Sequence, residues 1–178
     1  LADARLPEVD ALYIGGGFPE ACAAELEANT TLRSGIRQAI ASGMPAYAEC
    51  GGLMYLSRGI AYDGRTYEMV GAIPGDVVMH ARPVGRGYVH LKESEDHPWP
   101  RPSAPANQVK AHEFHYSEIR SLPSDTHYAY TVKRGHGVDG VAIVRDAAAT
   151  SAAATSAAAV PDAAAATSAV PDAAAAAV

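Results

Sequence analysis

The chain has 178 residues and a formal net charge of −6. This length supports a single buried core, and the acidic balance without a basic run argues against a nucleic-acid groove. No stretch of about 18 apolar residues predicts a membrane span. The only cysteines, Cys22 and Cys50, are too few for a disulfide framework, so we expect a cytoplasmic protein.

The first part of the chain predicts alternating strands and helices. Residues 10–14 form an apolar run that ends in three glycines, typical of a buried strand leading into a loop. We expect a helix over residues 19–28, and a second helix capped by Thr30 or Thr31 and ended by Gly43. A strand at residues 45–48 and a helix from residue 53 follow. This order indicates a parallel sheet with helices packed on it.

The second part of the chain predicts mainly antiparallel strands. Its β-branched and aromatic residues favour strands at 69–73, 76–80, 87–93, 109–119, 128–134 and 140–144, with a hairpin link at 135–139. The proline-rich residues 98–105 predict a surface loop.

Composition divides the chain after residue 146. From residue 147 to residue 178, 19 of 32 residues are alanine, which offers little side chain to bury and predicts a low-complexity, linker-like tail. The globular domain is therefore expected within residues 1–146. The start of the sequence has neither an initiator methionine nor a signal-peptide pattern, so we expect a fragment of a longer protein.

Residues 48–52, Ala-Glu-Cys-Gly-Gly, fall between a predicted strand and a predicted helix. This is the layout of a nucleophile elbow, in which a tight turn lifts the nucleophile above the sheet. The helix N-terminus beyond Cys50 favours its thiolate, and the N–H of Gly51 can face an oxyanion. A small, inert buried cysteine is the plainer interpretation, and it suits Cys22, which lies among alanines of a predicted helix.

Three segments carry a resemblance to a known family. They are residues 13–20 (Tyr-Ile-Gly-Gly-Gly-Phe-Pro-Glu), 48–56 (Ala-Glu-Cys-Gly-Gly-Leu-Met-Tyr-Leu) and 112–117 (His-Glu-Phe-His-Tyr-Ser). Together they closely resemble the glutaminase domain of cobyrinic acid a,c-diamide synthases. The resemblance implies the flavodoxin-like α/β fold of class I glutamine amidotransferases, with an N-terminal ATP-binding synthetase domain that this chain lacks.

The resemblance also implies a reaction, that of a glutamine-hydrolysing carbon–nitrogen ligase. Cys50 would attack glutamine, and amides of Gly16, Gly17 and Gly51 would hold the oxyanion. The ammonia would amidate the a and c carboxylates of a corrinoid precursor, cobyrinic or hydrogenobyrinic acid. ATP and Mg²⁺ are expected in the synthetase domain and no cofactor in this chain, whose histidines show no metal-ligand spacing.

One position of the family pattern is empty. In the family a relay histidine follows a Ser-Tyr-aliphatic run near the C-terminus, whereas the last histidine here is His136. His115 is the best remaining candidate for the catalytic base and His112 the second; on an extended strand they face opposite sides. The plainer interpretation makes this motif a wall of the pocket or of the domain junction. Glu49 either orients a group or is simply exposed at the turn.

Two other functions remain open. The first is a non-catalytic module of the same fold, left without its relay histidine. The second is the glutaminase domain of a related amidotransferase, such as cobyric acid synthase or a cell-wall amidating enzyme. The His-Glu-Phe-His-Tyr-Ser motif favours the a,c-diamide synthase over these relatives.

Overall fold

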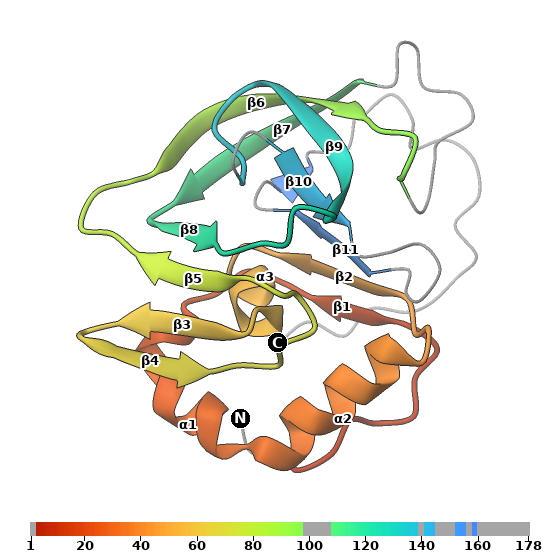
Figure 1. Ribbon diagram of the computed structural model, residues 1–178, viewed down its shortest axis with the longest axis vertical. Coiled ribbons are helices and arrows are strands. Elements are labelled where there is room, and N and C mark those ends of the chain that lie inside the picture. Colours follow the sequence, from red (N-terminus) through yellow and green to blue (C-terminus); the bar gives the residue numbers. More distant parts are fainter. Residues whose placement is uncertain (1–2, 98–107, 139–140, 145–151, 156–157, 160–178) are drawn as a thin grey trace, which may run out of the picture.

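The computed structural model describes residues 3–97, 108–138, 141–144, 152–155 and 158–159. Within these residues the strands form two sheets (Figure 1). One has eight strands in the order β1-β2-β11-β10-β9-β6-β7-β12, and the other has four in the order β4-β3-β5-β8. The expected proline-rich loop at residues 98–105 lies outside the described residues.

The elements have the following bounds along the described chain. The helical segments are the 3₁₀ helix η1 (Pro19–Cys22) and the α-helices α1 (Ala23–Ala28), α2 (Thr30–Ala41) and α3 (Gly51–Leu56). The strands of the first half are β1 (Leu12–Ile14), β2 (Ala46–Glu49), β3 (Gly59–Tyr62), β4 (Arg65–Glu68), β5 (Asp76–Met79) and β6 (Gly85–Glu93). Those of the second half are β7 (Gln108–His115), β8 (Ser117–Arg120), β9 (His127–Arg134), β10 (Val141–Val144), β11 (Ala152–Thr155) and β12 (Ala158–Ala159).

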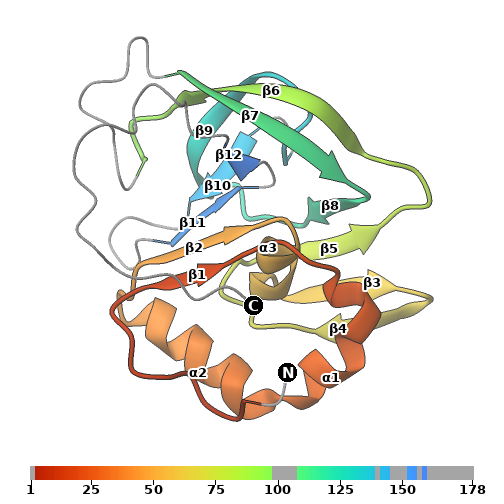
Figure 2. The ribbon, with the colours of Figure 1, turned by 180° about the vertical axis from the view of Figure 1, so that it is seen from behind.

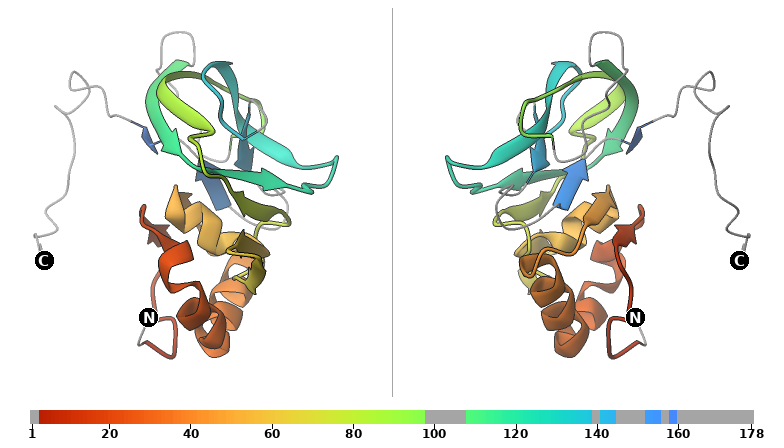
Figure 3. Two further views of the ribbon diagram at one scale, coloured as in Figure 1. Left: turned by 90° about the vertical axis from the view of Figure 1, so that its left-hand side faces the viewer. Right: turned by 90° about the vertical axis from the view of Figure 1, so that its right-hand side faces the viewer.

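The predicted order of strands and helices is present at the start of the chain. β1 and β2 run parallel, with Leu12 opposite Ala46 and Ile14 opposite Ala48. Figures 1 and 2 show α1 and α2 at the end of the molecule away from β6, β7 and β9, and the side views of Figure 3 agree. Because parallel strands end at the same sheet edge, the glycine loop after β1 and the turn after β2 lie side by side.

The helices differ in detail from the sequence expectation. The helix expected over residues 19–28 is broken at Cys22, where η1 ends and α1 begins, so Cys22 is half-buried at a junction and not inside one continuous helix. The cap of α2 is Asn29, whose side chain accepts the N–H of Leu32 at 3.2 Å. The prediction of Thr30 or Thr31 was wrong because Asn is an equally good cap and the helix begins one residue earlier. Gly43, with φ +100°, follows its end.

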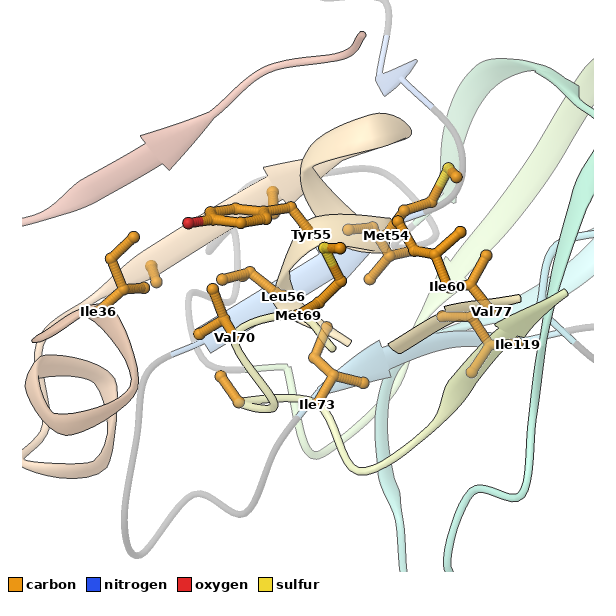
Figure 4. Packing of buried hydrophobic residues seen from close by; sticks show 14 of the residues in the cluster. Ile36, Met54, Tyr55, Leu56, Ile60, Met69, Val70, Ile73, Val77 and Ile119 are labelled. Carbon is orange, nitrogen blue, oxygen red and sulfur yellow. The ribbon is translucent and has the colours of Figure 1, made fainter. Parts of the chain in front are cut away.

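The main core lies between α2, α3 and the four-stranded sheet (Figure 4). Ile40, Ile60 and Val77 are completely buried and Leu56 is 2% exposed. Full burial of one such aliphatic side chain contributes about 1.5–3 kcal/mol. α3 carries the turn at Cys50, and all six of its residues are buried. The core therefore anchors that turn.

Residues 69–73 are not the predicted strand. Four of the five are buried, and their amides bond to the end of α3 and the turn beyond it: Val70 to the Tyr55 carbonyl, Gly71 to that of Ser57 and Ile73 to that of Leu56. The last carbonyls of a helix have no partner within the helix, and this segment supplies it. A continuous apolar run cannot distinguish a buried strand from such a helix-capping segment.

Two further differences concern strands. The sequence expectation lacks β3 and β4, which form a hairpin around Asp63 (φ +50°) and Gly64 (φ +74°). This Asp-Gly pair is a strong turn signal. The single strand expected at 109–119 is interrupted at Tyr116: β7 pairs with β6 in the larger sheet, whereas β8 pairs with β5 in the smaller one. The strands expected at 76–80, 87–93, 128–134 and 140–144 correspond to β5, β6, β9 and β10.

The alanine-rich tail contributes to the larger sheet, which corrects the expectation of a linker. β11 lies between β2 and β10, parallel to the first and antiparallel to the second. Ala152 lies opposite Ala46 and Thr155 opposite Glu49. A linker was expected because alanines bury little area, but alanine fits a central strand between closely packed neighbours when backbone hydrogen bonds are available on both sides. The residues after 159 lie outside the described ranges.

Candidate active site

Cys50 occupies the turn between β2 and α3 and has a strained backbone. Its φ is +48° and its ψ is −113°, a conformation that side chains other than glycine rarely adopt. The residue is exposed and its thiol is free. Strain of this kind persists only where the surroundings enforce it. The geometry is that of the nucleophile elbow expected from the sequence, with the thiol at the carboxyl edge of the parallel strands.

Two glycines after Cys50 allow the elbow to approach the loop after β1. A Cβ atom at Gly51 would lie 2.4 Å from the carbonyl oxygen of Gly17, and one at Gly52 would lie 2.3 Å from that of Ile14. Neither distance is sterically possible, so only glycine fits at both positions. A Cβ at Gly16 would lie 3.6 Å from the Cβ of Cys50. The structure thus brings together Cys50, Gly16, Gly17 and Gly51.

A small cavity opens beside the thiol of Cys50. Three parts of the fold enclose it: α3, the strand break between β7 and β8, and the turn after β9. The residues that line it are Cys50, Leu53, Met54, His115, Ser117, Glu118, Ile119, Gly137 and Val138. A wider and more open depression lies by the β3–β4 hairpin and is lined by residues 61–66 and 79–81. We place the site at the smaller cavity, because the wider one contains no nucleophile of comparable geometry.

His115 and His112 lie on opposite faces of β7, as the alternation predicted. His115 is 8% exposed and lines the cavity. Its Nδ1 lies 2.7 Å from the Ser117 carbonyl oxygen and its Nε2 lies 3.4 Å from a carboxylate oxygen of Glu113. The carbonyl can only accept, so Nδ1–H is the donor. His112 is exposed and makes an edge-on ring contact with Tyr88 at 5.8 Å.

Glu113 is a buried carboxylate that the sequence reasoning did not single out. It is 2% exposed and accepts the backbone N–H groups of His136 at 2.6 Å and Gly137 at 2.8 Å. Burial alone would raise the pKa of Glu113, but these bonds from Gly137 and His136, together with the nearby His115, outweigh it and leave the pKa lowered. A signal was present, because Glu113 is two residues before His115 and shares its face of the strand.

Glu49, beside the nucleophile, is held by two tyrosines. Its carboxylate accepts the hydroxyl of Tyr47 at 2.8 Å and that of Tyr13 at 3.3 Å. The two rings stack with centroids 5.7 Å apart. The negative charge of Glu49 is the main cause that raises the pKa of Tyr13, with desolvation and the hydrogen bond adding to it. Glu49 thus fixes two rings across β1 and β2 and is not simply exposed at the turn.

Other features bear on cofactors and membranes. Across the described ranges, no three His, Cys, Asp or Glu side chains converge as a metal site would require. Within the same ranges, every helix is too short or too polar to cross a lipid bilayer.

Sequence comparison gives a consistent result. The profile of the CobB/CobQ-like glutamine amidotransferase domain matches residues 1–157. The chain is similar to the cobyrinate a,c-diamide synthase of Magnetococcus marinus, with 45% identity over 79% of this chain and 29% of that protein. It is also similar to that of Methanosarcina barkeri, with 47% identity over 76% of this chain and 29% of that protein. The chain thus spans about three tenths of the length of these curated relatives.

Solved structures with the same fold confirm the expected fold class. A crystal structure of a glutamine amidotransferase superposes with a TM-score of 0.57 at 14% identity, covering 84% of this chain and 70% of that one. A GMP synthase component from Thermoplasma acidophilum superposes with a TM-score of 0.52 at 16% identity, covering 84% and 62%. The α/β class I amidotransferase fold, with parallel strands, flanking helices and added antiparallel strands, is therefore present.

Proposed function

Because this chain belongs to the CobB/CobQ-like glutamine amidotransferase domain family, we propose that it hydrolyses glutamine with Cys50 as the nucleophile. The observation that carries the proposal is the backbone of Cys50, held at φ +48° between β2 and α3 with its thiol exposed. Glycines 51 and 52, at which no side chain fits, maintain that turn.

The reaction follows from this geometry. The sulfur of Cys50 bonds to the side-chain amide carbon of glutamine, and the carbonyl oxygen takes the negative charge of the tetrahedral intermediate. We assign its stabilisation to backbone amides of Gly51 and of the Gly16–Gly17 loop, which meets the elbow. The carbon–nitrogen bond then breaks, the nitrogen takes a proton and leaves as ammonia, and water hydrolyses the thioester to glutamate.

Proton transfer is the weak step in this chain. His115 is our candidate for the base, supported by its position in the wall of the Cys50 cavity. However, its Nδ1 faces the Ser117 carbonyl and its Nε2 faces Glu113, so the ring must turn before either nitrogen can take a proton from the thiol. Absence of a general base typically costs about 10²–10⁴-fold in rate. We therefore expect slow hydrolysis.

A catalytically impaired module of the same fold is the second candidate function. It is favoured by the sequence of the tail, where no histidine follows His136. β11 runs parallel to β2 and ends with Thr155 opposite Glu49, so its carboxyl end lies at the sheet edge that carries Cys50. A relay histidine placed there would complete the site, and this chain has alanine, threonine and serine instead.

The whole parent protein is proposed to be a cobyrinate a,c-diamide synthase or a close relative. The similar proteins carry that name and are more than three times as long as the matched region. In this proposal an N-terminal synthetase domain binds ATP and Mg²⁺ and activates the a and c carboxylates of cobyrinic or hydrogenobyrinic acid. This domain supplies the ammonia. A cytoplasmic location agrees with the two free cysteines.

An ammonia-release assay with the isolated chain tests the proposal. We expect a glutamine-dependent rate above that of buffer, lost in Cys50→Ala and retained in Cys22→Ala. A gain of function separates the two candidates: replacing the residues after β11 with a Ser-Tyr-Leu-His run should raise the rate by about 10²-fold or more, and Cys50→Ala should abolish the gain. A variant without any gain would refute the empty-position argument.

A further inference from the structure

The carboxylate of Glu113 joins two parts of the chain that are distant in sequence. One oxygen, Oε1, accepts the N–H of His136, and the other, Oε2, accepts the N–H of Gly137. Oε2 also lies 3.4 Å from Nε2 of His115. A single buried side chain therefore holds both the turn after β9 and the ring at the end of β7.

The surrounding backbone leaves room for this arrangement. A Cβ at Gly85, which pairs with His115 across β6 and β7, would lie 2.2 Å from Nε2 of His115 and 2.9 Å from the Glu113 carboxyl carbon. A Cβ at Gly135 would lie 3.1 Å from the Glu113 oxygen, and Gly135 has φ +118°. Two glycines are thus needed for the imidazole and the carboxylate to share this space.

The groups that Glu113 holds form one wall of the cavity, although Glu113 itself does not line it. His115, Gly137 and Val138 line the cavity opposite α3, and Cys50 and Leu53 line it on the other side. We propose that Glu113 is a positioning residue for the proposed glutaminase site: it fixes the His136–Gly137 turn against the His115 ring and so sets the shape of the pocket that glutamine enters.

The chemistry of the bonds explains why a carboxylate is needed. Each oxygen accepts one backbone N–H, and ionised glutamate is an acceptor at both oxygens. Glutamine at this position would present one oxygen and one NH₂ group, so one backbone N–H would face a donor and lose its partner. A buried N–H without a partner is unfavourable, and the turn is expected to move away from it.

The inference rests on the proposed function, and its test compares two alkylating reagents on the full chain. Iodoacetamide needs only an exposed thiol, whereas a glutamine-shaped chloroketone must first fit the pocket. The variants are Glu113→Gln and Gly85→Ala, the second of which displaces the pair while keeping the carboxylate. The matched control is Glu93→Gln, because Glu93 is also a buried glutamate, 7% exposed, and lies on β6 outside the cavity.

We expect both variants to slow chloroketone labelling of Cys50 by about tenfold or more, since small misplacements in a site have effects of this size. Iodoacetamide labelling should stay within about twofold, and Glu93→Gln should change neither rate. Amide hydrogen exchange of His136 and Gly137 supplies a second readout and should accelerate about tenfold in Glu113→Gln. If Glu113→Gln does not fold, Gly85→Ala decides the labelling arm.

The outcomes separate the two ideas. If the wild-type chain shows no preference for the glutamine-shaped reagent, the proposed function fails, and the exchange rates of His136 and Gly137 decide the positioning role alone. A folded Glu113→Gln variant with unchanged exchange at both amides, or with an unchanged ratio of labelling rates where the wild type shows the preference, would overturn the inference.

Discussion

Gly51 lies so close to Gly17 that a methyl group on its Cα would come within 2.4 Å of the Gly17 carbonyl oxygen. This contact joins the turn after β2 to the loop after β1, and it places the residue next to Cys50 against the loop that we assign to the oxyanion. The geometry of the nucleophile therefore depends on two glycines that are 34 positions apart in the sequence.

The first prediction concerns this contact. Gly51→Ala should push the elbow away from the loop and slow labelling of Cys50 by a glutamine-shaped chloroketone by about tenfold or more. It should also lower the free energy of unfolding, by about 1–3 kcal/mol, as overpacking does. Labelling rates and urea unfolding provide the measurements.

Gly35→Ala is the matched control for that substitution. Gly35 lies inside α2, and a Cβ there meets no atom within 4 Å. Alanine in a helix interior is favoured over glycine by about 0.5–1 kcal/mol, so this variant should be slightly more stable and label normally. Equal losses in both variants would contradict the contact argument.

The second prediction concerns the tail. Truncation after residue 146 removes β11 and leaves β2 and β10 without their shared neighbour. We expect the melting temperature to fall by more than the roughly 2–4 °C that 1 kcal/mol represents in a domain of this size. Truncation after residue 160, which retains β11 and β12, should have a smaller effect. Identical melting temperatures for the two truncations would show that β11 adds nothing to stability.

The third prediction is the pH dependence of Glu113. Its pKa is lower in the folded protein than its ordinary value of 4.5, so the unfolded chain binds the proton more tightly. Ionised Glu113 therefore adds stability above about pH 4.5, and that contribution is lost as the pH falls through the folded pKa.

Urea unfolding of the wild type and of Glu113→Gln across this range provides the measurement. The difference in unfolding free energy between them should be largest near neutral pH and should shrink in acid. Glu25→Gln, an exposed position on α1, controls for removal of one negative charge. A difference that grows as the pH falls would contradict the assignment.

The fourth prediction concerns Tyr55 in the core. Its ring is 8% exposed, and its hydroxyl is buried without a hydrogen-bond partner among the described residues. Burial raises the pKa of Tyr55, and the charge of Arg33 opposes this only in part. Tyr55→Phe removes the unsatisfied hydroxyl and keeps the ring, so we expect stability to rise by about 1 kcal/mol. A loss of stability in thermal unfolding would reveal a partner for the hydroxyl.

The sequence predicted the parts of the site that depend on local pattern. The elbow at Cys50 and the glycines at 16 and 17 could be found because each depends on a short run of small residues beside a strand. The likeness to a family carried the fold class, because neither composition nor periodicity separates a class I amidotransferase from other α/β domains.

The remaining features depend on contacts between distant segments. Residues 69–73 are as apolar as a strand, but their amides bond to the carbonyls at the end of α3 and in the turn beyond it, which no local pattern shows. The break at Tyr116 depends on β8 pairing with β5. Glu113 became significant only when the turn at His136 was seen to donate to it. The alanines of β11 carry no strand signal of their own.

The most direct test of the central claim is to trap the thioester on Cys50. The chain is incubated with glutamine, quenched in acid and mapped by peptide mass spectrometry, with Cys50→Ala and Cys22→Ala treated in parallel. We predict a γ-glutamyl adduct on the Cys50 peptide of the wild type and of Cys22→Ala, favoured by the slow proton transfer that follows. An adduct on Cys22, or none on Cys50 in a folded chain at saturating glutamine, would contradict the account.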